Sequence, residues 1–199
     1  MFTSARAISS LISMLVMVLS LTGAAATPTP LEKGKLLVAT HQLDETPYRH
    51  AVILVTEHSD KGLFGLTINR PTPVFIDEFL PNTALREMPS SRLFMGGPNA
   101  KQVLFVVARA TQVAQLHHLA GDLYYGVGRD AATVLTQSPA NSQNVRAYAG
   151  YLNWPPGEID AAIAKGEWRV MPADAQTLFN SDPDSLWEQM MGAWDGQWM

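Results

Sequence analysis

Two polar residue pairs occur at the ends of largely apolar segments, and their side chains are of types that ligand-binding and acid–base sites use. Glu57-His58 follows the run 51–56, and Asn69-Arg70 follows the run 63–68. A carboxylate beside an imidazole orients the ring and favours its protonated form, and a guanidinium offers a planar set of donors to an anion. Both pairs are therefore candidates for a functional site.

Each pair also has a purely structural interpretation. Neighbouring side chains on a strand point to opposite faces of a sheet, which would separate Glu57 from His58. Asn69 tolerates unusual backbone angles, Pro71 ends a strand, and Arg70 can form an ion pair with Glu57 across a hairpin. We favour the structural interpretation for both pairs, with a ligand site as the alternative.

Two further features complete the candidate set. Gly96-Gly97 before Pro98 permits either a tight turn without side chains, which we favour, or a set of backbone N–H groups that binds an anion. Trp154, like the other four tryptophans, is expected to serve in core packing or in packing of the C-terminal segment. The candidate ligand-binding residues are Glu57, His58, Asn69, Arg70, Gly96, Gly97 and Trp154.

Motifs for several common chemistries are missing. The sequence contains no cysteine, no G-x-S-x-G, no H-E-x-x-H, no Walker lysine motif and no complete G-x-G-x-x-G. His117 and His118 fall in the segment 111–119, which is predicted as a helix. Neighbouring residues of a helix point about 100° apart, so these two cannot face one metal ion. The sequence predicts no catalytic constellation, no metal site and no cofactor.

The charge balance bears on the class of partner. The chain has 18 acidic and 14 basic residues, a net charge of −4, and no cluster of lysines and arginines. Binding to a nucleic-acid backbone depends on clustered positive charge. We therefore expect a small molecule or a protein as the partner, and no nucleic acid.

The N-terminus has the layout of a secretory signal peptide, because a single charge, Arg6, precedes an apolar run at 8–21 and three alanines. That run is shorter than the ~20 residues of a bilayer-spanning helix, so we expect no permanent membrane span in the mature chain. Export to the periplasm is the prediction; a cytoplasmic product from a misassigned start codon and a retained anchor are the alternatives. The predicted parts are a signal peptide at 1–26, a linker at 27–33 and one domain at 34–199.

Within that domain, strand-like segments come first and helix-like segments gather in the last third. Strands are predicted at 35–40, 51–57, 63–69, 93–95, 103–108, 124–125, 145–148 and 168–171. Besides 111–119, helices are predicted near 76–80 and 130–135, and then at 156–165, 173–179 and 185–192. Strands at 51–57 and 63–69 form a hairpin around Gly62, closed by Pro71 and Pro73. This order indicates an α+β class rather than a regular βαβ alternation.

Six short motifs in register resemble the YqgE/AlgH family of bacterial proteins. They are GKLLVAT (34–40), the Glu57-His58 pair, GLTINRP (65–71), FMGGP (94–98), GYLNWPPGEID (150–160) and EWRVMPAD (167–174). The resemblance implies a single domain of coiled, bifurcated, mainly antiparallel β-sheets with surrounding helices. It implies no established biochemical activity, and it brings with it a label of transcriptional regulator.

The chain departs from the family pattern at three places. His41 stands where the family usually has proline, and Leu152-Asn153 replace Ala-Gly, where asparagine is expected to adopt a positive φ. The leader is the third departure, since the family is typically cytoplasmic. This puts a cytoplasmic regulatory role in doubt here.

Three hypotheses about function follow. The first is a non-enzymatic binding or interaction domain, with a possible regulatory role, whose site gathers the candidate residues at strand ends. The second is a hydrolase-like or transferase-like enzyme with Glu57 or His58 as the base. The third is a transcriptional regulator, which the charge balance argues against.

Overall fold

The computed structural model describes residues 29–79, 91–110, 114–137 and 144–196. The predicted signal peptide at 1–26 and the first two residues of the predicted linker lie outside this part. So do Thr111 to Val113, the first three residues of the helix predicted at 111–119.

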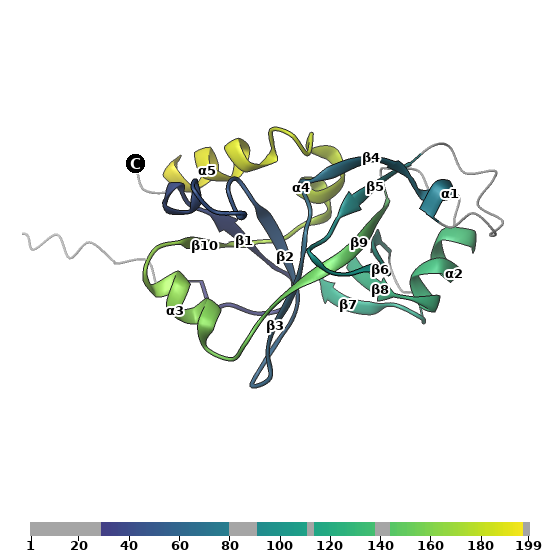
Figure 1. Cartoon of the computed structure of the whole chain (residues 1–199), viewed down its shortest axis with the longest axis horizontal. Coiled ribbons are helices and arrows are strands. Elements are labelled where there is room, and N and C mark those ends of the chain that lie inside the picture. Colours follow the sequence, from purple (N-terminus) through teal and green to yellow (C-terminus); the bar gives the residue numbers. More distant parts are fainter. Residues whose placement is uncertain (1–28, 80–90, 111–113, 138–143, 197–199) are drawn as a thin grey trace, which may run out of the picture.

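The described residues form one ten-stranded sheet with helices on both of its faces (Figure 1). The strands are β1 (Lys35–Ala39), β2 (Val52–Ser59), β3 (Gly62–Thr67), β4 (Pro71–Phe75), β5 (Arg92–Met95), β6 (Asn99–Arg109), β7 (His117–Ala120), β8 (Leu123–Val127), β9 (Val145–Trp154) and β10 (Trp168–Pro172). The helices are α1 (Ile76–Phe79), α2 (Arg129–Gln137), α3 (Glu158–Ala164), α4 (Ala175–Asn180) and α5 (Leu186–Gly196), with a 3-10 turn η1 (His41–Leu43).

The sheet forks at β9. The first half of β9 pairs with β5 in parallel, from Leu93 opposite Ala147 onward. Its last residues pair with β3 in the antiparallel sense, with Leu63 opposite Trp154. The other pairings are antiparallel, and the main path runs β10-β1-β2-β3-β9-β6-β8-β7. The predicted α+β class and the bifurcated, mainly antiparallel sheet are thus confirmed.

Alternation along β1 and β2 explains why their sequences read as continuous apolar runs. On β2, Val52 and Leu54 pack in one core cluster beneath α4 and α5, while Ile53 and Val55 pack in another beneath α3. Figure 1 shows α5 above β1 and α3 on the opposite side. A third cluster lies between α2 and the strands β6 and β9. Strands covered on both faces need apolar residues at every position.

The predicted hairpin is correct, but the prediction that Pro71 and Pro73 close it is wrong. β2 and β3 pair around Ser59 and Gly62. Pro71 does not close the hairpin and instead begins β4, which pairs only with β5 in the described sheet. Proline lacks an N–H and is tolerated on such an edge strand.

The helix predicted at 111–119 is also wrong for the described residues. Residues 117–120 form β7, which pairs with β8 through a turn at Gly121, whose φ is +54°. His117 and His118 are exposed, but on a strand.

Asn153, expected at a positive φ, instead lies within β9, where its Oδ1 accepts a hydrogen bond from Asn99 Nδ2 (2.8 Å). No helix among the described residues has the length and apolar character needed to cross a bilayer.

Candidate functional site

The loop that joins β1 to β2 is fixed by the Asn69-Arg70 pair. Asn69 Nδ2 donates to the carbonyl of His50, and Asn69 Oδ1 accepts from the amide of Val52, both at 2.9 Å. Arg70 Nη2 donates to the carbonyls of Pro47 (2.7 Å) and Arg49 (3.3 Å). The two side chains therefore hold a loop that lies about twenty residues earlier in the sequence. They have the structural role that the sequence favoured.

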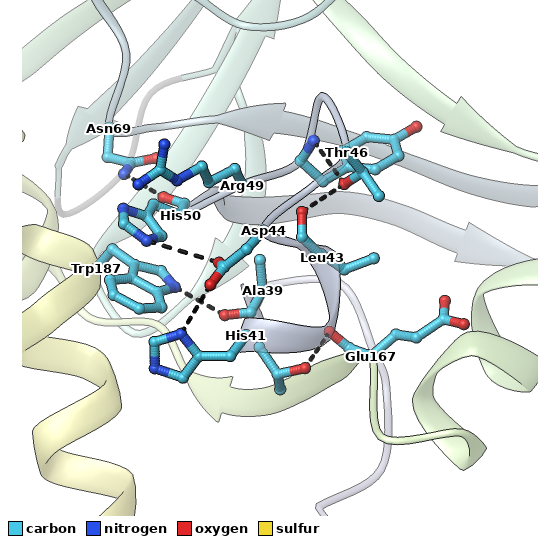
Figure 2. A network of polar contacts seen from close by, with 12 residues as sticks. Ala39, His41, Leu43, Asp44, Thr46, Arg49, His50, Asn69, Glu167 and Trp187 are labelled. Carbon is cyan, nitrogen blue, oxygen red and sulfur yellow. Dashed lines mark hydrogen bonds and ion pairs between the residues drawn. The ribbon is translucent and has the colours of Figure 1, made fainter.

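The other side of this loop packs on α5, as Figure 2 shows. The indole of Trp187 stacks on the imidazole of His50, with ring centroids 3.8 Å apart and planes at 12°. Its Nε1 donates to the carbonyl of Ala39 (2.7 Å). Asp44 lies between two histidines, 3.0 Å from His41 Nδ1 and 3.7 Å from His50 Nε2. The loop is thus held on one side by the residues that follow β3 and on the other side by α5.

A cavity of about 390 Å³ opens where this loop faces the Gly96-Gly97 turn. Its volume falls within the range of small-molecule sites. Tyr48 of the loop, Met95 of β5 and Leu152 of β9 contribute apolar surface, and the largely buried Thr67 contributes a small polar side chain. Arg70 and Gly97, both candidates from the sequence, also line it.

Two glycines are required at the turn because the chain passes close to β9. A Cβ placed on Gly97 would lie 2.2 Å from the carbonyl of Tyr151, and one on Gly96 would lie 2.3 Å from the carbonyl of Gly150. The Gly96 amide donates to Ala149 (2.9 Å), and its carbonyl accepts from the Thr67 amide (2.8 Å). The turn therefore joins β3 and β9 through the backbone, and the Gly96 amide is already occupied within the sheet.

The charge of this cavity is positive. Lys101 lines it together with Arg70, and no aspartate or glutamate of the described residues does. None of the ion pairs among the described residues involves either cation. In a chain with a net charge of −4, two cations without carboxylate partners thus face one apolar cavity.

A second cavity, of about 340 Å³, lies on the other side of Tyr48 and contains Trp154. Tyr48 is 5.7 Å from Trp154 and 5.5 Å from Trp168, measured between ring centroids. Burial raises the pKa of the Tyr48 hydroxyl above its ordinary value, and the negative charge of Glu158 raises it further. Tyr48 is therefore a wall shared by two cavities, one with cations and one with the carboxylates of Glu158 and Glu167.

Glu57 and His58 line neither of these two cavities. His58 Nδ1 lies 3.0 Å from the carbonyl of Leu31, and its Nε2 lies 3.8 Å from Asp160 at α3. Glu57 is exposed. The pKa of the Tyr125 hydroxyl on β8 is raised mainly by the burial of Tyr125 and further by the negative charge of Glu57. The two neighbours thus interact with different elements, and Arg70 is paired with loop carbonyls rather than with Glu57.

Several residues of the site were not predicted from the sequence, among them Tyr48, Lys101 and Trp187. Lys101 offered a weak signal, since it follows the Gly-Gly-Pro turn by three residues. Tyr48 comes from a polar loop, and only the tertiary fold brings it to the cavity that Arg70 lines. Trp187 comes from the C-terminal helix and reaches the same loop at His50. Among the described residues, no group of three or more histidines and carboxylates is placed to hold a metal ion.

Similar structures support the fold. A protein of Corynebacterium diphtheriae superposes with a TM-score of 0.68 and 24% identity, over 84% of this chain and 89% of that one. The AlgH protein from Pseudomonas aeruginosa gives a TM-score of 0.64 at 24% identity, with the same coverage. At this identity the likeness establishes the fold alone.

Sequence comparison extends the likeness to a family. A UPF0301 protein of Methylococcus capsulatus is 32% identical over 165 residues, 79% of this chain and 88% of that protein. A UPF0301 protein of Mycobacterium tuberculosis is 32% identical over 164 residues, 79% of this chain and 80% of that protein. Residues 36–199 match the family model described as AlgH-like. This chain therefore belongs to the AlgH-like family.

Proposed function

We propose that this chain is a non-enzymatic binding domain that holds a small molecule in the cavity between Tyr48 and the Gly96-Gly97 turn. The observation that carries the proposal is the cavity itself, about 390 Å³ in volume and lined by Arg70, Gly97 and Lys101. Its walls come from segments that are already fixed by hydrogen bonds, from the Arg70 side chain to the loop and between backbone groups at the glycine turn, so little order has to be created on binding.

Binding without catalysis is supported by the separation of Glu57 and His58. A general base must lie within hydrogen-bond reach of the proton that it removes, and a second group must activate or orient it. His58 instead lies against Leu31 and Asp160, and Glu57 is exposed on β2. We place no nucleic acid among the partners, because the net charge is −4.

A regulatory role is part of the proposal. Tyr48 lines the cavity, and its loop also packs on α5 through His50 and Trp187. A ligand that displaces Tyr48 would change the contact between the loop and α5, and hence the surface that the C-terminal helix offers to another protein. Coupling of this kind requires that the ligand binds one conformation of the β1–β2 loop more tightly than the other.

Chemical-shift mapping tests the binding site. The ¹⁵N-labelled domain is titrated with a fragment panel, and binding fragments are expected to shift the amides of Thr67, Met95 and Lys101. Met95→Trp should fill the cavity and abolish these shifts, whereas Met95→Leu, a matched change of similar volume, should keep them. Fragments that shift other residues alone, or that bind Met95→Trp equally well, would contradict the proposal.

Export is a separate proposal that rests on the sequence pattern of residues 1–26. Intact-mass measurement of the protein from cell fractions of its own host tests it. A periplasmic species that begins near Thr27 supports export, and a cytoplasmic species that begins at Met1 or at a later start codon contradicts it.

A further inference from the structure

We infer that the ligand of the Tyr48 cavity is an organic anion, with a compact apolar body and one carboxylate, sulfonate or phosphate group. The inference rests on the proposed function and adds the charge of the ligand to it. It follows from the apolar and cationic side chains that line the cavity, and from the absence of carboxylate partners for the two cations among the described residues.

The apolar part of the ligand is specified by the walls. The apolar lining consists of Tyr48, Met95, Leu152, Pro47 and Pro98. Much of the cavity surface is therefore hydrocarbon, with one aromatic ring. Such surface favours a ligand body that loses water on entry. A small inorganic ion would leave these walls without a contact.

The charge of the ligand is specified by Arg70 and Lys101. Arg70 uses Nη2 for the carbonyls of Pro47 and Arg49, which fixes the plane of its guanidinium. The remaining N–H groups of Arg70 make no hydrogen bond to any described residue, and neither cation has a carboxylate within ion-pair distance there. A guanidinium that is held in place by carbonyl groups and has no carboxylate partner among the described residues is suited to an anionic group, because it forms strong, charge-assisted hydrogen bonds without being reoriented.

The neighbouring cavity provides an internal contrast. It shares Tyr48 but carries Glu158 and Glu167 as well as Lys165. The two carboxylates disfavour an anion there. An organic anion should therefore discriminate between two cavities that have similar volumes and one wall in common.

Two fluorescent dyes that differ in a single charged group test the inference on the full domain. 1-Anilinonaphthalene-8-sulfonate carries a sulfonate, and N-phenyl-1-naphthylamine has the same two aromatic parts without it. We expect Lys101→Glu to weaken binding of the sulfonate dye about tenfold and to change binding of the neutral dye less than about twofold. Lys165→Glu makes the same change in net charge at the other cavity and should leave both affinities unchanged. High salt should reduce the effect of Lys101→Glu, because Lys101 is exposed.

The outcomes separate the two levels of the proposal. If Met95→Trp abolishes binding of both dyes but Lys101→Glu changes neither, the cavity is a ligand site without preference for anions, and the inference fails alone. If Met95→Trp affects neither dye, the proposed function itself fails. Equal weakening of the sulfonate dye by Lys101→Glu and Lys165→Glu would also overturn the inference, because the effect would then come from net charge.

Discussion

Trp187 of the C-terminal helix stacks face to face on His50 of the β1–β2 loop, with ring centroids 3.8 Å apart. The same indole donates a hydrogen bond to the carbonyl of Ala39, 148 residues earlier in the chain. One side chain therefore connects α5 to both ends of the loop that forms a wall of the cavity.

Trp187→Phe should destabilise the domain, because it removes the indole N–H and part of the stacked surface. We expect the free energy of unfolding to fall by about 1–3 kcal/mol, measured by urea denaturation. Glu188→Gln, an exposed change on the same helix, is the control and should have little effect. Equal stability of the Trp187 variant and the control would show that α5 is not anchored by this residue.

Asn69→Ala should lower the free energy of unfolding by about 2 kcal/mol, because the His50 carbonyl and the Val52 amide both lose a partner. Asn69→Asp keeps an acceptor for Val52 but cannot donate to His50. Its stability, also measured by urea denaturation, should fall between those of the wild type and the alanine variant. An alanine variant as stable as the wild type would show that the loop does not depend on these two hydrogen bonds.

Gly97→Ala should be strongly destabilising, by about 2 kcal/mol or more, because the new methyl group overlaps the Tyr151 backbone. Gly192→Ala is the matched change: nothing lies within 4 Å of a Cβ placed there, on helix α5. That substitution should stabilise the domain by about 0.5–1 kcal/mol through helix propensity. Thermal unfolding followed by circular dichroism would show the opposite signs, and a neutral Gly97→Ala would mean that the turn can move away from β9.

Tyr148→Phe should alter stability at alkaline pH. Tyr148 is fully buried, and burial raises its pKa from 10.0 to about 12, although the nearby Arg146 opposes part of this rise. The unfolded chain releases the phenolic proton near pH 10 while the native state keeps it. The contribution to stability is therefore complete below pH 10 and is lost between pH 10 and about 12, at about 1.4 kcal/mol per pH unit.

The phenylalanine variant should lose this part of the pH dependence, as measured by urea unfolding over that alkaline range. At neutral pH it should change stability little, because Tyr148 Oη makes no well-formed hydrogen bond to a described residue, although the Arg146 guanidinium lies near it. An unchanged alkaline slope would assign the pH dependence to another group.

Local patterns in the sequence predicted the parts of the fold that local interactions determine. The β2–β3 hairpin follows from β-branched residues on either side of a turn at Gly62, where φ is +114°. The same reasoning failed at β7, because its strand character comes from pairing with β8 and the short segment before Gly121 carries no strong signal of its own. Pro71 was interpreted as a strand end, since the sequence does not show that β4 lies at an edge.

The candidate site was predicted in part for a similar reason. Asn69, Arg70, Gly96 and Gly97 stand in distinctive local motifs, and the structure brings Arg70 and Gly97 to one cavity. The contribution of Tyr48 depends on how the loop folds back over β3, and that of Lys101 on the course of β6. Glu57 and His58 do not meet at one site, because His58 lies against Leu31 and α3 while Glu57 is exposed.

The fork at β9 has a mechanical consequence. Because β3, with β2 beside it, and β5, with β4 beside it, both join the rest of the sheet at this one strand, detaching either branch leaves backbone N–H and C=O groups of β9 without partners. The two branches cannot come apart one after the other like separate modules, and the chain should lose its structure in a single cooperative step. A polypeptide truncated before Val145 would lack β9, the strand on which both branches pair, and neither branch should then fold.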